Sequence, residues 1–144
     1  DRSKRERYEG FCQALTDAGK KVDSSLCLTT PLGIDTYREE IDTFLSSLSR
    51  MPDAFVCASD YVACILMQLL EKRGLRVPED VAVSGFDNNT EDLLAEHLTT
   101  VQVFNEELGA RLALQILYRI KYPNTPHEVT YLGTNVLYRD STGD

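Results

Sequence analysis

The sequence has few of the residues that mark catalytic or metal centres. Its 144 residues include only two histidines and four cysteines, and no two cysteines form a C-x-x-C pair. His97 and His127 lie near no cysteine in the sequence, which argues against a zinc site. The short motifs of serine hydrolases, zinc proteases, nucleotide-binding loops and dinucleotide-binding folds are also missing. We therefore expect no metal, no cofactor and no enzymatic activity.

Long apolar runs are missing too, because no stretch approaches the roughly 20 residues that span a bilayer. The apolar content of 42% and the charged content of 26% are ordinary for a soluble globular protein. A chain of 144 residues is long enough to bury one core. Scattered cysteines without a disulfide framework favour a reducing compartment. The sequence predicts a cytoplasmic protein with no membrane partner.

Excess positive charge is the third absence. The formal net charge is −8, and residues 22–100 carry five bases against fourteen acids. Such a surface repels phosphate backbones. Residues 1–21 carry six Lys or Arg against four acids, and this segment is either a nucleic-acid arm or, as we favour, a solvated helix face. The chain by itself is not predicted to be a DNA-binding module.

Helical and extended patterns alternate along the chain. Apolar residues at helical spacing predict helices over 3–18, 35–49, 60–73 and 106–120, with a short helical patch at 91–95. Short apolar runs predict extended segments over 26–29, 54–58, 81–86, 99–104, 129–132 and 135–138. Strands that alternate with helices predict an α/β fold, with a parallel sheet flanked by helices on both faces.

Polar residues follow two of the predicted strands. Ser59 and Asp60 come directly after the predicted strand at 54–58, and Asp87 comes directly after the predicted strand at 81–86. Because ligands bind outside the carboxyl ends of parallel strands, these residues predict a cleft for a small polar molecule. A carboxylate such as that of Asp87 can accept hydrogen bonds from two adjacent hydroxyls, as sugar binding requires. Asp60 and Asp87 could in principle support glycoside hydrolysis, but two carboxylates near a cleft are too common to indicate an enzyme.

Each of these residues also has a structural alternative. Asp87 could cap the helical patch at 91–95 or form an Asx-turn. Ser59 is equally well placed to cap the helix that starts at residue 60. We interpret Asp60 as mainly structural, since a negative charge is favourable in the first turn of a helix.

Arg7 is the residue of the first helix that we single out. It lies one turn before Phe11 on the apolar stripe, in the half of the helix nearest the carboxyl ends of the strands. A guanidinium has five donors and keeps its charge, which suits the recognition of hydroxyls and carboxylates. Its structural alternative is an ion pair with Asp60 or Asp87 inside the cleft.

The helix over 60–73 is apolar on nearly every side, with Gln68 the one strongly polar residue between Tyr61 and Leu70. Such a helix must be buried on more than one face. It is either a central helix flanked by its neighbours or, as we favour, part of a subunit interface. The interface residues would be Tyr61, Ile65 and Leu69.

The chain resembles the effector-binding region of LacI/GalR-type transcriptional repressors over nearly its whole length. Six stretches carry the resemblance: Arg7-Tyr-Glu-Gly-Phe11, Pro52-Asp-Ala-Phe-Val-Cys-Ala-Ser-Asp60, Arg73-Gly-Leu-Arg-Val-Pro-Glu-Asp-Val-Ala-Val-Ser-Gly-Phe-Asp87, Leu98-Thr-Thr-Val101, Glu107-Leu-Gly109 and Tyr138-Arg-Asp-Ser-Thr142. The resemblance implies a periplasmic-binding-protein-like fold, in which two α/β subdomains are hinged around a sugar or related effector. It also implies a homodimer and an N-terminal helix-turn-helix domain that this sequence does not contain.

The resemblance also assigns roles to single residues. Arg7 matches the arginine that contacts the sugar in this family, and Asp87 matches the aspartate that holds the sugar hydroxyls. Ser59 stands where the family usually has the asparagine of an Ala-Asn-Asp motif. Val103 stands where the family often has a glutamine. Both departures imply an effector other than those that the family most commonly binds. Asp60 and Val103 are secondary candidates for effector contact.

The family's domain plan implies three parts. Residues 1–103 would form most of the C-terminal effector-binding subdomain, without its first strand. Residues 104–133 would be crossover elements of the N-terminal subdomain, and residues 134–144 a return segment and tail. The sequence thus predicts the effector-binding and dimerising portion of a LacI-type transcriptional regulator. The alternative is a sugar-binding receptor of a transport system, which shares the fold.

Overall fold

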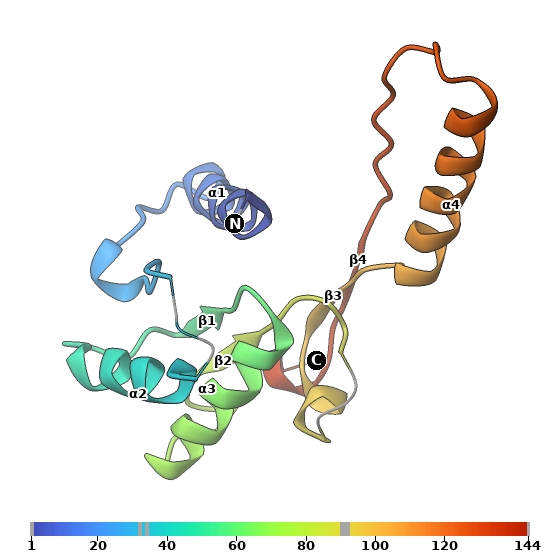
Figure 1. The fold of residues 1–144 in the computed structure, drawn as a ribbon. Coiled ribbons are helices and arrows are strands. Elements are labelled where there is room, and N and C mark those ends of the chain that lie inside the picture. The colour runs from blue at the N-terminus through green and yellow to red at the C-terminus, as the bar shows by residue number, and fades with distance from the viewer. Residues whose placement is uncertain (1, 32, 34, 90–92, 144) are drawn as a thin grey trace.

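A computed structural model describes residues 2–31, 33, 35–89 and 93–143 of the chain. It shows helices arranged around short central strands, from which one helix and its extended return segment project as a hairpin (Figure 1). The α/β fold with a parallel sheet, predicted from the sequence, is confirmed.

The sheet is built from four three-residue strands. Strand β1 (Ala54–Val56) pairs in parallel with β2 (Ala82–Ser84), and β3 (Thr100–Gln102) pairs antiparallel with β4 (Asn135–Leu137). Two parallel bridges, Ser84 to Thr99 and Asp87 to Gln102, join the two pairs. Strand β2 and the residues after it therefore lie between β1 and β3.

Helix α3 (Asp60–Lys72) is the centre of the core. It begins because the Ser59 hydroxyl accepts a hydrogen bond from the Val62 amide, which is the cap that a serine supplies. Its sides contact helix α2 (Tyr37–Ser47), β2 and the 3-10 helix η2 (Leu93–His97). The buried apolar residues gather around it: Ile41, Leu45, Ala63, Cys64, Ile65, Leu66, Leu69, Leu70, Val81, Val83, Ala95 and Leu98.

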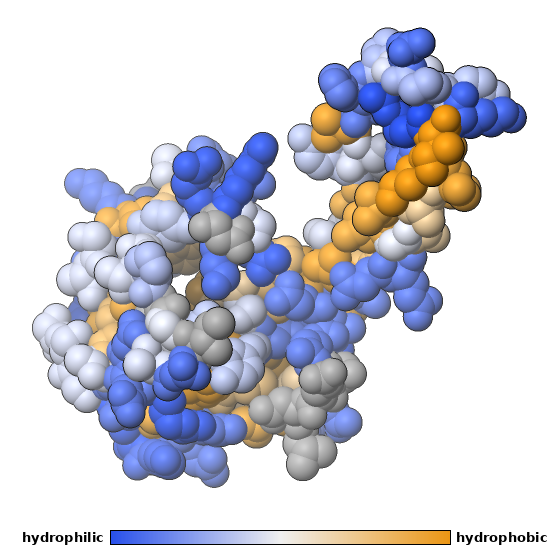
Figure 2. Space-filling view, viewed as in Figure 1, coloured by the Kyte–Doolittle hydropathy of each residue, from blue (hydrophilic) through white to orange (hydrophobic). Residues whose placement is uncertain are grey.

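Two of the α-helices have no buried residue. Helix α1 (Arg2–Asp17) lies above the carboxyl edge of β1 and β2, and α4 (Asn105–Lys121) extends away from the sheet (Figure 1). The α4 hairpin, residues 105–134, leaves the sheet through β3 and returns through β4. Figure 2 shows apolar side chains along this hairpin, and those of Leu112, Leu117 and Ile120 are each more than half exposed.

Two predicted strands are wrong. Residues 26–29 form no strand, because Asp23 caps a short 3-10 helix instead, η1 (Ser24–Leu26), by accepting a 3.0 Å hydrogen bond from the Ser25 amide. Such local side-chain bonds compete with a strand ladder. Residues 129–132 also form no strand, since nothing in the described part of the chain pairs with them. The helical patch predicted at 91–95 is η2 from residue 93 onward, and residues 91 and 92 lie outside the described ranges.

Candidate effector-binding site

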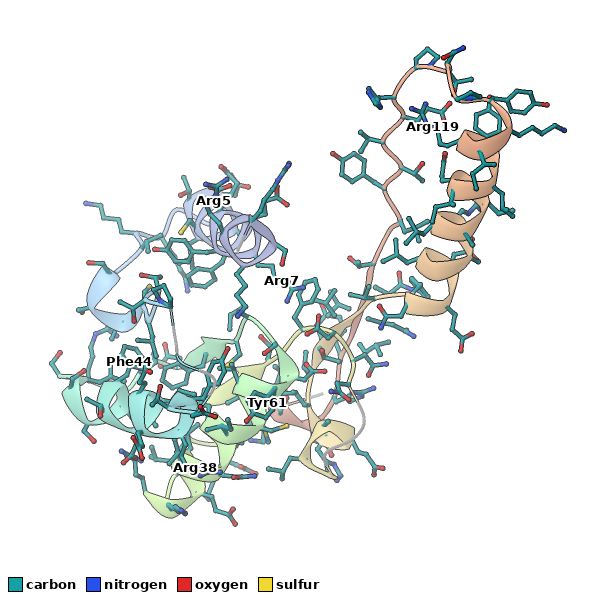
Figure 3. The ribbon with its side chains drawn as sticks, viewed as in Figure 1. Arg5, Arg7, Arg38, Phe44, Tyr61 and Arg119 are labelled. Carbon is teal, nitrogen blue, oxygen red and sulfur yellow. The ribbon has the colours of Figure 1, made fainter. Side chains whose placement is uncertain are left out.

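Arg7 and Asp87 meet at the carboxyl edge of β1 and β2. The Arg7 Nη2 atom lies 3.3 Å from Asp87 Oδ1, and Arg7 Nη1 donates to the carbonyl oxygen of Ala58. The guanidinium carbon lies 3.7 Å from the centre of the Phe86 ring, within the range of a cation–π contact. Figure 3 shows Arg7 on the side of α1 that faces the sheet. Segments 80 residues apart thus place a donor fork and a carboxylate together.

The Asp87 carboxyl is only partly covered, with a side chain 43% exposed against 27% for Arg7. Burial raises the pKa of Asp87, and the positive charge of Arg7 works in the opposite direction. The nearby Asp60 charge raises it further. An accessible carboxylate beside a guanidinium offers acceptors and donors within a few ångströms, which is the pairing that adjacent hydroxyls of a sugar can engage.

Asp87 sits on an unusual backbone. Its φ is 109°, and that of Asn88 is 53°, so two consecutive residues other than glycine occupy the positive-φ region that L-residues rarely adopt. The Asp87 amide donates to the carbonyl of Val101 over 2.9 Å. The Asn88 amide that follows donates to Thr100 Oγ1 on β3 over 3.3 Å.

Asp60 lies beneath this turn and is 2% exposed. Its Oδ1 accepts a 2.6 Å hydrogen bond from the Thr100 hydroxyl, and its Oδ2 accepts a 2.7 Å bond from the Asn89 amide. A buried carboxylate held in this way fixes the two segments that it joins. Whether Asp60 also touches an effector stays a prediction.

The remaining predicted contacts lie nearby. Ser59 is half-buried and its hydroxyl caps α3, with 3.4 Å between Oγ and the Val62 nitrogen. Val103 is half-buried just after β3. Whether either residue touches an effector stays a prediction.

The three predicted interface residues differ in exposure. Tyr61 is 60% exposed, whereas Ile65 and Leu69 are 8% and 3% exposed and pack in the core. The Tyr61 ring meets that of Tyr37 edge-on, with centres 5.7 Å apart. These rings border an open groove of about 240 Å³ between α2 and α3. Its other lining residues are Asp35, Arg38, Cys64, Ile65 and Gln68.

Sequence reasoning did not single out Phe86, Asn88, Thr100 or Arg139, which complete this site. Phe86 lies under the Arg7 guanidinium, and Thr100 fixes Asp60. Arg139 reaches the turn from the far end of the chain and donates to Asn88 Oδ1 over 2.8 Å. The Asp-Asn-Asn run was a signal for a turn, but no local pattern joins it to an arginine 51 positions away.

A second hollow, of about 330 Å³, lies in the α4 hairpin and is far from these residues. Among the described residues, no group of three His, Cys, Asp or Glu side chains is placed to hold a metal ion. Nor does the described part contain a helix long and apolar enough to cross a membrane.

The model of one protein family, the periplasmic binding protein-like domain, matches residues 1–142. The chain belongs to this family. Curated relatives include the HTH-type transcriptional regulator CelR of Thermobifida fusca, 34% identical over 142 residues that cover 94% of this chain and 40% of CelR. The HTH-type transcriptional repressor PurR of Photobacterium profundum is 30% identical over 142 residues, which cover 97% of this chain and 42% of PurR.

Solved structures of similar fold include transcriptional regulators as well. A LacI-family regulator from Sanguibacter keddieii has a TM-score of 0.83 and 30% identity, over 96% of this chain and 52% of that one. A CelR–cellobiose complex has a TM-score of 0.83 and 31% identity, over 94% of this chain and 42% of that one. The resemblance to LacI/GalR-type regulators is therefore confirmed. The chain spans less than half the length of CelR and PurR, and the named relatives are regulators rather than enzymes.

Proposed function

We propose that this chain is the effector-binding and dimerising portion of a LacI-type transcriptional regulator, and that its effector is a sugar or sugar derivative. The observation that carries the proposal is the Arg7–Asp87 pair, which joins α1 to the turn after β2 at the carboxyl edge of the sheet. The CelR–cellobiose complex, which shares the fold at 31% identity, supports a sugar as the ligand class. The regulators among the relatives favour this function over that of a transport receptor.

The proposal extends to the domain plan. Residues 1–103 belong to the C-terminal effector subdomain, 104–133 are crossover elements of the other subdomain, and 134–144 return from it. The exposed apolar side chains of α4 support packing against further protein of that second subdomain, because apolar surface of this extent is rarely left in water. Effector binding changes subdomain closure and thereby the spacing of DNA-binding domains. DNA is bound through an N-terminal domain outside this sequence, in the cytoplasm.

Isothermal titration of a sugar panel that includes cellobiose tests the effector site. We expect one class of sugar to bind, and Arg7→Ala and Asp87→Ala each to weaken its binding at least tenfold, since each removes a charged hydrogen-bonding group. Arg5→Ala is the matched control, because Arg5 lies on the same helix and forms only an exposed ion pair with Glu9. Unchanged affinity in both site variants would remove the assignment.

The proposed dimer uses the α3 surface around Tyr61, with Ile65 and Leu69 supporting it from the core. Sedimentation of wild type and Tyr61→Asp tests this interface, because a charge placed within a packed apolar contact is costly. We expect Tyr61→Asp to raise the dissociation constant of the dimer at least tenfold. Tyr131→Asp is the control, since Tyr131 is an exposed tyrosine on the α4 hairpin, 86% exposed against 60% for Tyr61. A dimer lost in the control but kept in Tyr61→Asp would place the interface elsewhere.

A further inference from the structure

Arg139 lies two residues after the end of β4 and occupies a fixed place beside the sheet. Its amide donates to Thr99 Oγ1 over 2.8 Å. Two positions later the buried Ser141 donates from its hydroxyl to the Val83 carbonyl over 2.6 Å and accepts from the Thr99 amide over 2.8 Å. The backbone that carries Arg139 is therefore anchored to the centre of the sheet.

The Arg139 guanidinium joins two segments. Nη1 donates to the carbonyl oxygens of Ala95 and Leu98, each at 3.0 Å, and Nη2 donates to Asn88 Oδ1 at 2.8 Å. A planar guanidinium that makes all these bonds has little freedom to rotate. The Asn88 side chain is thereby held at a defined position, next to Asp87.

The turn that Arg139 holds needs outside support. The positive φ angles of Asp87 and Asn88 persist only where surrounding contacts enforce them. From β3, Thr100 Oγ1 accepts from the Asn88 amide over 3.3 Å, and from α3, Asp60 accepts from the Asn89 amide. These contacts fix the backbone of the turn, and the hydrogen bond from Arg139 fixes the Asn88 side chain.

We infer that Arg139 is a positioning residue that fixes the Asp87–Asn88 turn and so aims the Asp87 carboxylate at Arg7 and at the effector. The effector part of this inference rests on the proposed function. Arg139 lies two residues after β4, and Thr100 lies on β3. The turn is therefore bonded through Asn88 both to β3 and to the segment that follows β4.

Amide hydrogen exchange on the ligand-free protein tests the positioning role. We expect Arg139→Ala to speed the exchange of the Asn88 and Asn89 amides at least tenfold, while the Val83 amide in the core exchanges as in wild type. Asn88→Gly is the second variant, because glycine adopts the same positive φ but lacks the amide oxygen. If Arg139→Ala does not fold, the amide exchange of Asn88→Gly alone tests the positioning role. Arg119→Ala is the matched control, since Arg119 donates to backbone carbonyls of Thr125 and Pro126 at the far end of the α4 hairpin.

Cellobiose titration adds the binding readout. Arg139→Ala and Asn88→Gly should each weaken binding about tenfold. The double variant should bind no more weakly than Arg139→Ala alone, because the bond that Asn88→Gly deletes is already lost in Arg139→Ala. Additive losses in the double variant, or unchanged exchange of the Asn89 amide in both single variants, would overturn the inference. If wild type binds no sugar of the panel, the proposed effector class fails, while the exchange measurements still decide the role of Arg139.

Discussion

Gly85 is the position where one added methyl group should disturb both the core and the site. A Cβ atom at this residue would lie 2.2 Å from Asp60 Oδ1, 2.8 Å from Leu98 Cδ2 and 3.1 Å from Asp60 Cα. The Oδ1 atom cannot retreat freely, because it accepts the 2.6 Å hydrogen bond from Thr100. Gly85→Ala must therefore move the start of α3 or rotate a buried carboxylate away from its donor.

The magnitude follows from two costs. Overpacking a well-packed core costs about 1–3 kcal/mol, and a buried hydrogen-bonding group left without its partner costs about 1–3 kcal/mol. Since part of the strain relaxes by giving up the bond, we expect a loss of about 3 kcal/mol in the free energy of unfolding. For a urea slope of about 2 kcal/mol per M, the unfolding midpoint falls by about 1.5 M.

Urea unfolding followed by circular dichroism measures this loss, with Gly109→Ala as the control. Gly109 lies inside α4 and a Cβ there meets nothing within 4 Å, so alanine should stabilise the helix by up to about 1 kcal/mol. A Gly85→Ala variant within 0.5 kcal/mol of wild type, a limit set by ordinary surface substitutions, would show that the Gly85–Asp60 packing is not as described.

Three further predictions concern single ionisable groups. Arg7→Ala should raise the pKa of Asp87 further, since in the wild type the positive charge of Arg7 opposes the effect of burial on this pKa. Carboxyl NMR titration measures the change, and a lower pKa of Asp87 in the variant would contradict the ion pair. The Arg76 hydrogen bonds lower the pKa of Asp80 from 3.8 to about 2, so their stabilisation is complete above about pH 4 and is lost as the pH falls towards 2. Asp80→Asn should thus lower the urea midpoint at pH 6 but not at pH 2, and an equal loss at both pH values would refute this. Desolvation of the thiol raises the pKa of Cys57 from 9.0 to about 12, although the residue as a whole is half-buried. This pKa leaves roughly a thousandth of the thiolate of an ordinary cysteine at pH 8; mass spectrometry should find Cys57 unmodified by iodoacetamide in the native protein, and rapid labelling would contradict the raised pKa.

The sequence predicted the long helices well, because their apolar spacing and end signals are local. Helix α3 begins at residue 60 as predicted, since Ser59 supplies a cap that needs no distant partner. The strands were harder to predict than the helices. A strand exists only where another chain segment completes its ladder, and nothing in residues 26–29 revealed that Asp23 would cap a 3-10 helix there instead.

In the site too, features that depend on local sequence were predicted and those that depend on distant partners were not. The positions of Arg7 and Asp87 followed from strand ends and helix halves, and the structure places them 3.3 Å apart. The hydrogen bond between Arg139 and Asn88 did not follow, because it joins residues 51 positions apart through the arrangement of the whole sheet. Likewise, the apolar pattern of α3 could not tell burial by α2, β2 and η2 from burial by a second subunit. Only the packed structure shows that Ile65 and Leu69 are covered within the chain while Tyr61 is exposed.

A crystal structure of the protein with the tightest-binding sugar of the panel tests the central claim most directly. We predict sugar hydroxyl oxygens within about 3.2 Å, the limit of a normal hydrogen bond, of both the Arg7 guanidinium and the Asp87 carboxylate. A sugar bound elsewhere, with the Arg7–Asp87 edge touching only solvent, would contradict the account.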